Sequence, residues 1–542
     1  MFGAGGGTSS YQEIEETDLI VMWGSNAREA HPIFFHHVLK GIRSGARMFA
    51  VDPRRTSTAA WADVWLGIDV GSDIALANAV AREIIEQGFH NTEFIESATE
   101  GFDEFAACVD RYTLDRAEKI TGVPASAIQQ LAHEYASAGM AQICWTLGIT
   151  EHHNATDNVL ALINLALLTG HVGRYGSGLV PVRGQNNVQG GGDMGALPNK
   201  LPGFQDVENP DLRGRFEVVW GQEIPAQAGK HISLMHEAMD DGTLRCLYVL
   251  GENPLQSEAD SQEMRKRLEN LEFMVAQDIF LTATAELADV VFPAAGWGES
   301  DGTFTSSERR VQRVRKAVDP PGEARDDIEI LSDLARAMDH DWKNLTAEEA
   351  WDEMRSLSPL HGGMSYQRLD AMGGIQWPCP DEESDGELFL HGRLWERPMT
   401  TQPAPFHAVE YAAPVDELSD EFPTRLTTGR RLDSYNMGVQ SGRYSSPRRI
   451  AGVLDLSPED GASLGVAEGE RVKVTSRRGS LEAPVRFDRS LRPGLAFMSV
   501  HFPDQTDVNV LTVDAWDPKS GTAEFKATAI RVEPVGAGAA GT

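Results

Sequence analysis

The amino-acid sequence predicts an α/β protein in which two parallel-sheet domains are followed by a C-terminal β-barrel or sandwich. The length of 542 residues exceeds what one hydrophobic core supports, so several domains are expected. Short apolar runs alternate with amphipathic stretches in two separate blocks, which is typical of parallel sheets covered by helices. After Thr424 the hydrophobic residues recur at every second position, which indicates half-buried strands.

The first block supplies the elements of one parallel sheet. In chain order it predicts strand 19–23, helix 31–42, strand 48–51, strand 62–68, helix 74–85 and strand 142–147. A further helix runs to about residue 168; Asn154 is expected to cap it, Asp157 lies in its first turn, and Gly170 ends it. Because this helix is apolar on nearly every side, we expect it to be buried.

The second block repeats this order of strand, polar turn and helix. It predicts strands 247–250, 273–276 and 290–293, and the first of them ends at Gly251-Glu252-Asn253-Pro254. The repetition predicts two related nucleotide-binding halves. Residues 323–357 are expected to be helical, whereas 358–405 are rich in Pro, Gly and acidic residues without a strong period and are interpreted as a connecting segment.

The C-terminal part contains a hairpin signal. Two alternating runs, 471–476 and 481–485, flank Arg477-Arg478-Gly479-Ser480. The last residues, 535–542, are rich in Gly and Ala and are expected to form a frayed tail. The chain is therefore predicted to comprise a first α/β domain over 1–185, a second over 186–345, a connecting segment over 346–405, a barrel over 406–535 and a flexible tail over 536–542.

Composition and charge exclude some classes of function. The net charge of −33 disfavours non-specific binding to nucleic acid or to an anionic membrane. The best apolar stretch, 160–168, is too short for membrane insertion, and the residues after Met1 lack a secretory signal, so a cytoplasmic protein is expected. The cysteines are isolated, so each is interpreted as a buried small hydrophobe and none as a metal ligand: Cys108, Cys144, Cys246 and Cys379.

Polar residues stand at the predicted carboxyl ends of the strands in the first block. Gly24 and Asn26 follow the first strand, where a nucleotide phosphate can approach closely. Asp52 ends the second strand, and Asp73 follows the third, where carboxylates can accept hydrogen bonds from ribose hydroxyls. For Asp52 alone, a simple strand stop before proline is an equally good interpretation. Three such strand ends together favour a nucleotide site.

The most informative stretch covers residues 181–198. It holds one cation, Arg183, together with four side-chain amides and five glycines. Glycines allow close backbone approach, amides supply paired donors and acceptors, and an arginine offers a planar fork to a carboxylate or another oxyanion. A solvated flexible loop is the usual interpretation of such a composition, but the apolar residues Val182, Val188, Met194 and Leu197 favour an ordered site.

The stretch from Val182 to Gly190, with 193–198 after it, closely resembles the signature of molybdenum- or tungsten-dependent formate dehydrogenase large subunits. These belong to the molybdopterin oxidoreductase superfamily. The resemblance continues in order along nearly the whole chain, through motifs at 23–26, 52–54, 71–73, 148–152, 251–254, 277–280, 288–293, 302–305, 427–430 and 525–533. It implies two Rossmann-like parallel-sheet domains, a C-terminal double-psi β-barrel and a bis-molybdopterin guanine dinucleotide cofactor with molybdenum or tungsten.

The same resemblance implies roles for individual residues. Arg183 would bind the carboxylate of formate, and Gln185 would line the site. The first guanine dinucleotide would lie on Gly24, Asn26, Asp52 and Asp73, and the second on Gly251, Asn253, Asp278 and Thr282. The barrel would close over the pterins through Thr428, Arg430, Asn509 and Lys526. Glu151, His152 and His153 are candidate proton or cofactor contacts, although a polar strand end before a helix is the simpler interpretation of these three.

One part of the family pattern has no match in this sequence. Upstream of the matched region, family members carry cysteines for a [4Fe-4S] cluster and a Cys or selenocysteine metal ligand followed by His. We therefore expect a fragment or a split subunit that is incomplete by itself, with apolar surface exposed around 190–198 and the second block and with an electron-transfer or N-terminal partner subunit. The implied reaction is two-electron oxidation of formate to CO2. Alternatives are a nitrate-reductase-like enzyme acting on another oxyanion and a non-catalytic cofactor-binding fragment.

Overall fold

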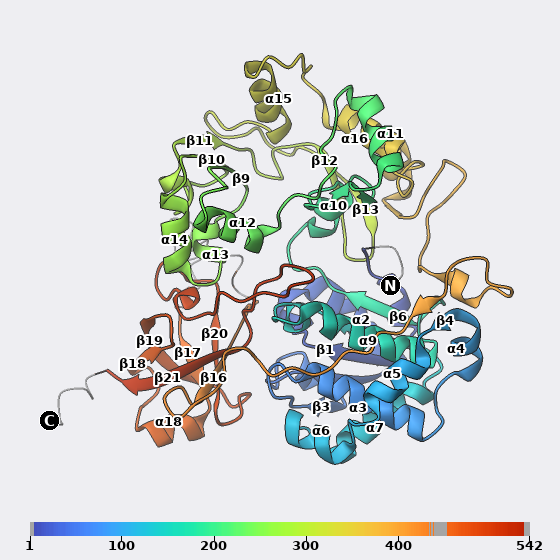
Figure 1. Cartoon of the computed structure of the whole chain (residues 1–542), viewed down its shortest axis with the longest axis vertical. Helices are drawn as coiled ribbons and strands as arrows, with labels where there is room; N and C mark the ends of the chain where they lie inside the picture. The colour runs from blue at the N-terminus through green and yellow to red at the C-terminus, as the bar shows by residue number, and fades with distance from the viewer. Residues whose placement is uncertain (1–4, 433, 435–436, 438–451, 536–542) are drawn as a thin grey trace.

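The computed structural model describes residues 5–432, 434, 437 and 452–535 (Figure 1). Its first domain is built on a five-stranded sheet with the order β3-β2-β1-β5-β6, in which each neighbouring pair is parallel. The elements of this domain are η1 (Glu13–Glu15), β1 (Leu19–Trp23), α1 (Ala27–Ala30), α2 (Pro32–Ser44), β2 (Arg47–Val51), η2 (Ala59–Trp61), β3 (Val64–Leu66), α3 (Asp73–Glu86), α4 (Thr92–Ala98), β4 (Thr99–Glu100), α5 (Phe102–Val109), α6 (Leu114–Thr121), α7 (Ala125–Ser137), β5 (Ala141–Trp145), α8 (Leu147–Thr150), α9 (Ala155–Thr169) and β6 (Gly178–Pro181).

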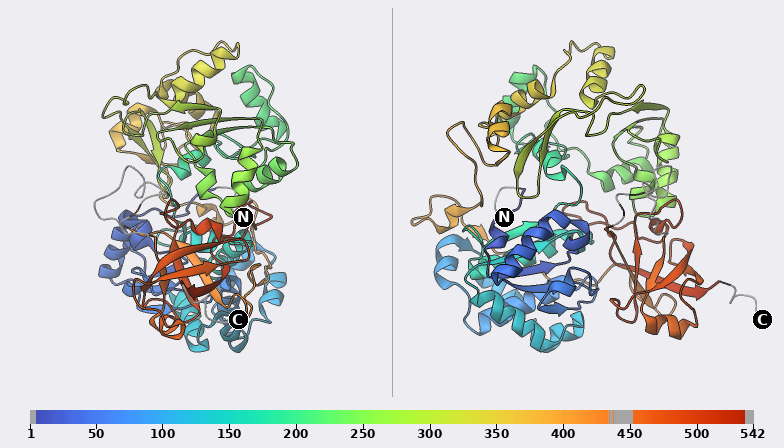
Figure 2. Two further views of the ribbon diagram at one scale, coloured as in Figure 1. Left: turned by 90° about the vertical axis from the view of Figure 1, so that its left-hand side faces the viewer. Right: turned by 180° about the vertical axis from the view of Figure 1, so that it is seen from behind.

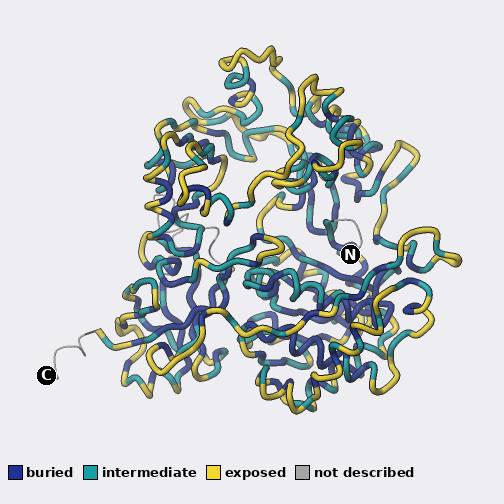
Figure 3. Tube along the Cα trace, in the orientation of Figure 1, coloured by how far each residue is buried: buried dark blue, intermediate teal, exposed yellow. Residues whose placement is uncertain are grey.

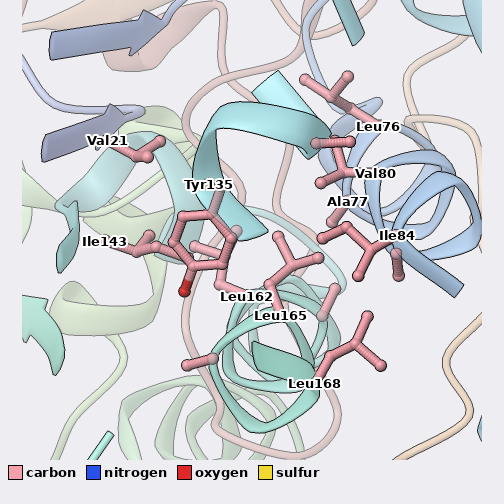
Figure 4. Close-up of a cluster of buried hydrophobic side chains, with 14 of the residues drawn as sticks. Val21, Leu76, Ala77, Val80, Ile84, Tyr135, Ile143, Leu162, Leu165 and Leu168 are labelled. Atoms are coloured by element: carbon pink, nitrogen blue, oxygen red, sulfur yellow. The ribbon is translucent and has the colours of Figure 1, made fainter. Parts of the chain in front are cut away.

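Helices cover both faces of this sheet, as the apolar strands predict. Successive residues of β1 belong to different cores, because side chains alternate between the faces of a strand. Val21 lies in a cluster with α3, α7 and α9, whereas Met22 lies in a second cluster with α2. Figure 4 shows Val21 and Ile143 of the sheet beside Val80 of α3 and Leu165 of α9. The carboxyl ends of the strands are thereby held at one edge of a rigid layer.

Helix α9 is buried as expected, but its N-terminus is capped differently from the prediction. Asn154 occupies the N-cap position without a side-chain capping hydrogen bond, since its Oδ1 accepts from Asn158 Nδ2 at 3.3 Å. The backbone N–H of Thr156 donates instead to the carboxylate of Asp517 in the C-terminal domain, at 3.2 Å. Gly170 ends the helix in a left-handed conformation with φ of 71°, which confirms the predicted stop.

The second parallel sheet has the order β11-β10-β9 and matches the three strands predicted for the second block. Met274 and Val249 face a core formed with α12 and α14. On the opposite face the described residues leave Phe273 44% and Leu250 46% exposed, beside exposed Cys246. The surrounding elements are α10 (Val188–Asp193), β7 (Lys200–Leu201), β8 (Gln205–Asp206), α11 (Pro210–Trp220), α12 (Ile232–Asp240), β9 (Cys246–Leu250), α13 (Pro254–Ser257), α14 (Ser261–Glu269), β10 (Phe273–Asp278), η3 (Ala285–Leu287) and β11 (Val290–Pro293).

Residues after β11 form a small antiparallel sheet, β12-β13-β14, with helices beside it. Trp377 and Cys379 are buried in its core, and the backbone N–H of Leu390 donates to Thr8 O at 2.8 Å. The chain from 358 to 405 thus packs against other parts of the molecule, while the predicted domain boundaries stay a prediction. The elements are β12 (Gly302–Thr305), β13 (Arg310–Val314), α15 (Asp327–Ala337), α16 (Ala347–Leu357), α17 (Tyr366–Met372), β14 (Ile375–Gln376), η4 (Gly392–Trp395) and β15 (Ala404–Pro405).

The C-terminal part is a closed six-stranded barrel with the order β16-β20-β17-β19-β18-β21, so a barrel and not a sandwich forms. The predicted hairpin is confirmed by antiparallel pairing of β18 with β19, from Arg471↔Pro484 to Thr475↔Ser480. Figure 2 shows the barrel beside the first domain, with the second parallel sheet and the β12-β13-β14 sheet above both. The elements are β16 (Thr424–Gly429), β17 (Leu454–Leu456), α18 (Pro458–Leu464), β18 (Arg471–Thr475), β19 (Ser480–Phe487), β20 (Leu495–Ser499), η5 (Val508–Val510) and β21 (Thr528–Pro534).

Burial is uneven along the chain (Figure 3). Cys144 and Cys379 are buried as predicted, Cys108 is half-buried, and the prediction is wrong for Cys246, which is exposed on the open face of the second sheet.

Across the described residues, no helix has both the length and the apolar character needed to cross a bilayer. The cytoplasmic location stays a prediction, and the predicted tail over 536–542 lies outside the described residues.

Candidate functional site

The two parallel sheets carry the same hydrogen-bonded motif at their carboxyl ends. Gly24 follows β1 with φ of 57°, and Gly251 follows β9 with φ of 63°, a region that favours glycine. Asn26 Oδ1 accepts from the hydroxyl of Thr58 at 2.9 Å. In the second sheet Asn253 Oδ1 accepts from the hydroxyl of Thr284 at 2.8 Å. The two halves therefore build the same hydrogen-bonded geometry twice.

The repeat extends to the aspartates that end the next strands. Asp52 Oδ1 accepts from the N–H of Arg54 at 2.9 Å, and Asp278 Oδ1 accepts from the N–H of Phe280 at 3.1 Å. Thr282 Oγ1 accepts from the N–H of Ala285, as Thr56 does from the N–H of Ala59. Our sequence reasoning missed the threonines at 56, 58 and 284. The spacing D-x3-T-x-T, present at 52–58 and at 278–284, is the signal that reveals them.

A cavity lies at the carboxyl end of the first sheet, where the barrel meets it. It brings together seven of the predicted cofactor-binding residues: Gly24, Asn26, Asp52, Asp73, Thr428, Arg430 and Lys526. Gly24 and Gly148 form its floor in close contact, since a Cβ added to Gly148 would lie 2.5 Å from Gly24 O. The ends of β1 and of β5 meet there without side chains between them, which leaves room for a ligand.

Burial raises the pKa of both carboxylates in this cavity. Burial raises the pKa of Asp52 to about 6, and burial likewise raises the pKa of Asp73, although nearby His152 opposes that shift. Asp73 Oδ1 accepts from Trp23 Nε1 at 2.8 Å, which fixes its orientation. In the second half, burial also raises the pKa of Asp278. Carboxylates with raised pKa values at a cavity are typical of binding sites.

Asp52→Asn is expected to stabilise the protein at neutral pH by about 1–2 kcal/mol, because it removes a charge that the cavity disfavours. The pKa of about 6 in the folded state lies above the usual value of 3.8 for an aspartate, so the penalty is absent below pH 3.8 and complete above pH 6. Urea unfolding at pH 4.5 and pH 7.5 checks this: the gain should grow with pH. The control Asp103→Asn, at an exposed position of α5, should show no such trend. A loss of stability in Asp52→Asn at pH 7.5 would contradict the account.

The barrel closes this cavity through a buried cluster of charges. Glu524, which is 1% exposed, accepts the backbone N–H groups of His153, Lys526 and Ala527, each at 3.0 Å, and lies 3.3 Å from His152 Nδ1. Lys526 Nζ pairs with Glu151 at 2.5 Å and donates to Thr428 O at 3.2 Å. The three residues from 151 to 153 therefore connect the first domain to the barrel.

This cluster holds opposite charges on Glu524 and His152. Burial opposes the charged form of Glu524, but His152 and the hydrogen bonds to residue 153 keep the pKa of Glu524 well below its usual range. Burial also opposes protonation of His152, but Glu524 and Asp73 raise its pKa above the usual value. His152 is thus favoured as a cation between two carboxylates. Asn509 makes a separate contact, since its Nδ2 donates to Gln256 O at 3.0 Å and joins the barrel to α13.

A second cavity of about 400 Å³ adjoins the first and contains Arg183 and Gln185. The cavities share His31 and Gly184 as lining residues. His31 Nε2 lies 2.7 Å from Arg183 O, and burial lowers the pKa of His31 to about 4, so the imidazole is neutral at pH 7. Arg430 of the barrel donates to Gly184 O at 3.3 Å. The predicted substrate and cofactor residues therefore lie in neighbouring, connected positions.

The stretch around Arg183 is more regular than the sequence indicates. Residues 188–193 form a short helix, α10, although three of its six positions are glycine. Gly190 leaves room for the side chain of Asn187, because an added Cβ would lie 2.0 Å from Asn187 Oδ1. Val182 is buried, but Val188 is 42% and Leu197 41% exposed, in line with the apolar surface expected around 190–198.

A third cavity of about 390 Å³ lies between the loop after β2 and the barrel, and it is rich in arginine. Arg431 and Arg486 both pair with the buried carboxylate of Asp455, at 2.9 and 2.7 Å. The lining also includes Arg54, Arg55 and Arg430. In a chain of net charge −33, this concentration of guanidinium groups points to an anionic ligand. Within 5–432 and 452–535, no group of three or more His, Cys, Asp or Glu side chains converges as a metal site.

Known proteins resemble this chain over almost its whole length. Residues 4–337 match the molybdopterin oxidoreductase family, and residues 424–529 match the molybdopterin dinucleotide binding domain. The F420-dependent formate dehydrogenase 2 subunit alpha of Methanococcus maripaludis is 41% identical over 98% of this chain and 79% of its own length. Formate dehydrogenase H of Escherichia coli is 38% identical over 98% of this chain and 75% of its own length.

The fold agrees with these matches. Acetylene hydratase from Pelobacter acetylenicus has a TM-score of 0.75 at 22% identity, covering 97% of this chain and 79% of the other, which shows a shared fold. The family match over 4–337 and the relatives at 38–41% identity show the class of protein. The chain belongs to the molybdopterin oxidoreductase family and is an oxidoreductase of the formate dehydrogenase alpha-subunit type.

Proposed function

We propose that this chain oxidises formate to CO2 by two electrons, at molybdenum or tungsten held by two molybdopterin guanine dinucleotides. The observation that carries the proposal is the position of Arg183, a half-buried cation in a cavity that shares His31 and Gly184 with the carboxylate-lined cavity. The relatives named above as formate dehydrogenases support the choice of formate. When bound, the metal cofactor supplies the two-electron acceptor.

The residues present fit such a cofactor. Two repeated strand ends match two nucleotide portions, and the carboxylates of Asp52 and Asp278 suit the N–H donors of guanine. The arginines of the third cavity suit diphosphate oxygens. In this assignment Gly24, Asn26, Asp52 and Asp73 hold one dinucleotide, and Gly251, Asn253, Asp278 and Thr282 hold the other. Glu151, Thr428, Arg430, Asn509 and Lys526 enclose the pterins.

The chain's own residues position the substrate. The guanidinium of Arg183 binds the formate carboxylate through charge and paired N–H donors, and it orients the C–H bond towards the cofactor. Gln185 lines the same cavity and contributes an amide to its wall. His31 contacts the backbone carbonyl of Arg183 as a neutral imidazole, so it leaves the positive charge of the site to the guanidinium.

The open face of the second sheet supports the expectation of a further polypeptide at this position. Parallel sheets are normally covered on both faces, yet Phe273 and Leu250 are exposed there. In this proposal the added polypeptide carries the [4Fe-4S] cluster and the Cys or selenocysteine ligand, and passes electrons onward. The names of several relatives include the words subunit alpha, which supports assembly with other subunits.

Formate-dependent dye reduction by the protein purified with its natural partners tests this function. Formate is expected to reduce a viologen dye, nitrate is not expected to reoxidise the reduced dye, and acid release should yield two guanines for each molybdenum or tungsten atom. Nitrate reduction without formate oxidation would favour an enzyme of another oxyanion. Guanine and metal without either activity would identify a non-catalytic cofactor-binding module.

A further inference from the structure

Within the described part of the chain, the guanidinium of Arg183 is held only by neutral groups. Its Nε donates to Gln189 Oε1 at 3.0 Å, and its Nη2 donates to Gly5 O at 2.8 Å. Among the residues that the structure describes, no carboxylate forms an ion pair with it. Its side chain is therefore anchored, while its charge is not neutralised by contact with an acid.

The orientation of the Gln189 amide is fixed by its other neighbours. Gln189 Nε2 donates to Asp193 Oδ1 at 2.8 Å and to Gly5 O at 3.1 Å. A carboxylate and a carbonyl only accept hydrogen bonds, so the NH2 group must face them and Oε1 must face Arg183. The residue that selects the acceptor presented to Arg183 is thus Asp193.

Asp193 is itself rigidly placed. It lies four residues after Gln189 on α10, is 0% exposed, and accepts from Trp377 Nε1 at 2.9 Å through its second oxygen. Gln189 is 1% and Trp377 0% exposed, so water does not compete for these hydrogen bonds. A row of hydrogen-bonded side chains runs from the core of the molecule to the wall of the second cavity, in the order Trp377, Asp193, Gln189 and Arg183.

We propose that Gln189 and Asp193 are positioning residues for oxyanion binding: Asp193 orients Gln189, and Gln189 orients the guanidinium of Arg183 while separating it from the carboxylate. The inference rests on the proposed function, in which Arg183 binds formate. It explains why a neutral amide stands between a buried acid and a half-buried base only ten residues apart along the chain. Direct pairing of the two would satisfy both charges and leave the cavity without a free cation.

The negative charge of Asp193 stabilises the charged form of Arg183 without direct contact. Burial lowers the pKa of the Arg183 guanidinium, and the nearby negative charge of Asp193 opposes that shift. A buried cation is costly without a compensating charge, so placing the carboxylate one side chain away stabilises the cation and preserves its free face. Geometry and charge therefore point to the same arrangement.

Asp193→Asn tests the inference on the protein as purified, with its cofactor and partners. Asparagine has one acceptor and cannot accept from both Gln189 and Trp377, so one donor must lose its partner or Gln189 must turn over. Binding of 13C-formate, followed by NMR line broadening, is expected to weaken by about ten- to a hundredfold, as for loss of a charge-assisted hydrogen bond. Gln189→Met, which removes the amide at similar volume, should give the same loss if Asp193→Asn does not fold.

The double variant Gln189→Glu with Asp193→Asn keeps the hydrogen bonds that position Arg183 but moves the negative charge from residue 193 to residue 189. Residue 193 can again satisfy Trp377, and residue 189 can again accept from Arg183 Nε, so thermal stability should recover relative to Asp193→Asn. The carboxylate now contacts the guanidinium directly, and formate affinity should stay at least about tenfold below that of the natural protein. Recovery of formate affinity together with stability would overturn the separating role of Gln189.

Two further variants make the outcomes distinguishable. Asp416→Asn alters another buried carboxylate, which pairs with Arg477 and Arg478 in the barrel, and it should reduce stability without changing formate binding. Unchanged formate binding in both Asp193→Asn and Gln189→Met, with binding lost in Arg183→Ala, would overturn the inference alone. Formate binding that survives Arg183→Ala would instead overturn the proposed function.

Discussion

Replacing Arg183 with alanine is expected to lower kcat/KM for formate by about a thousandfold. In the proposed function the guanidinium supplies both the charge and the paired donors that fix the carboxylate, and electrostatic positioning of this kind contributes several orders of magnitude to rate. Arg183→Lys keeps the charge but loses the planar fork, so we expect an intermediate loss of about ten- to a hundredfold. Initial rates of dye reduction over a range of formate concentrations measure both effects.

The matched control is Arg265→Ala, which removes a half-exposed arginine from α14 on the surface. It should leave kcat/KM within a factor of about two, because exposed ion pairs contribute little. Metal content must stay equal among the variants, so that the loss reports substrate binding and not loss of the cofactor. Arg183→Ala with full formate activity and normal metal content would refute the role assigned to this residue.

Glu524→Ala is expected to destabilise the protein by about 3–5 kcal/mol. The substitution leaves buried N–H groups of His153, Lys526 and Ala527 without their acceptor and leaves His152 without its counter-charge. Glu524→Gln keeps an acceptor and loses the charge, so its cost should be about half as large. Surface substitution Glu263→Ala, which removes an exposed pair with Lys266, should cost less than about 1 kcal/mol.

The pH dependence of this loss has a defined sign. The pKa of folded Glu524 is lowered, so its stabilising contribution is complete above the unfolded value of 4.5 and is lost as pH falls through the folded pKa. The pKa of folded His152 is raised, so its contribution is complete below 6.5 and is lost as pH rises through the folded pKa. The difference between natural protein and Glu524→Ala should therefore be largest between about pH 4.5 and 6.5 in urea unfolding. A difference that is constant from pH 4 to 9 would argue against this pair of charges.

Much of the first domain could be predicted because its signals are local. The run 19–23 matches β1 residue for residue, since a buried parallel strand is apolar throughout and ends at a glycine. The helix capped by Gly170 was predictable for the same reason, as left-handed glycine caps follow from backbone conformation. The hairpin between β18 and β19 was visible in its alternating pattern.

Other parts of the site depend on contacts that no local window contains. Glu524 and His152 are separated by 372 positions, and neither has a neighbour in sequence that indicates the other. Helix α10 contains Gly190-Gly191-Gly192, which disfavours a helix, and its hydrogen bonds to Arg183 and Trp377 stabilise it from outside. The Asn154 prediction was wrong because Asp517 of the barrel satisfies the first turn of α9 instead.

The borrowed cap on α9 links the barrel to the backbone of the first domain. Asp517 accepts the N–H of Thr156, and Glu524 accepts the N–H of His153, so two amides beside the cofactor cavity are protected by side chains from another domain. If the barrel separates from the first domain, these two amides become exposed to solvent, although their own domain stays folded. The rate of amide hydrogen exchange at these two positions therefore reports how often the cavity between the two domains opens, and no label on the barrel is needed to measure it.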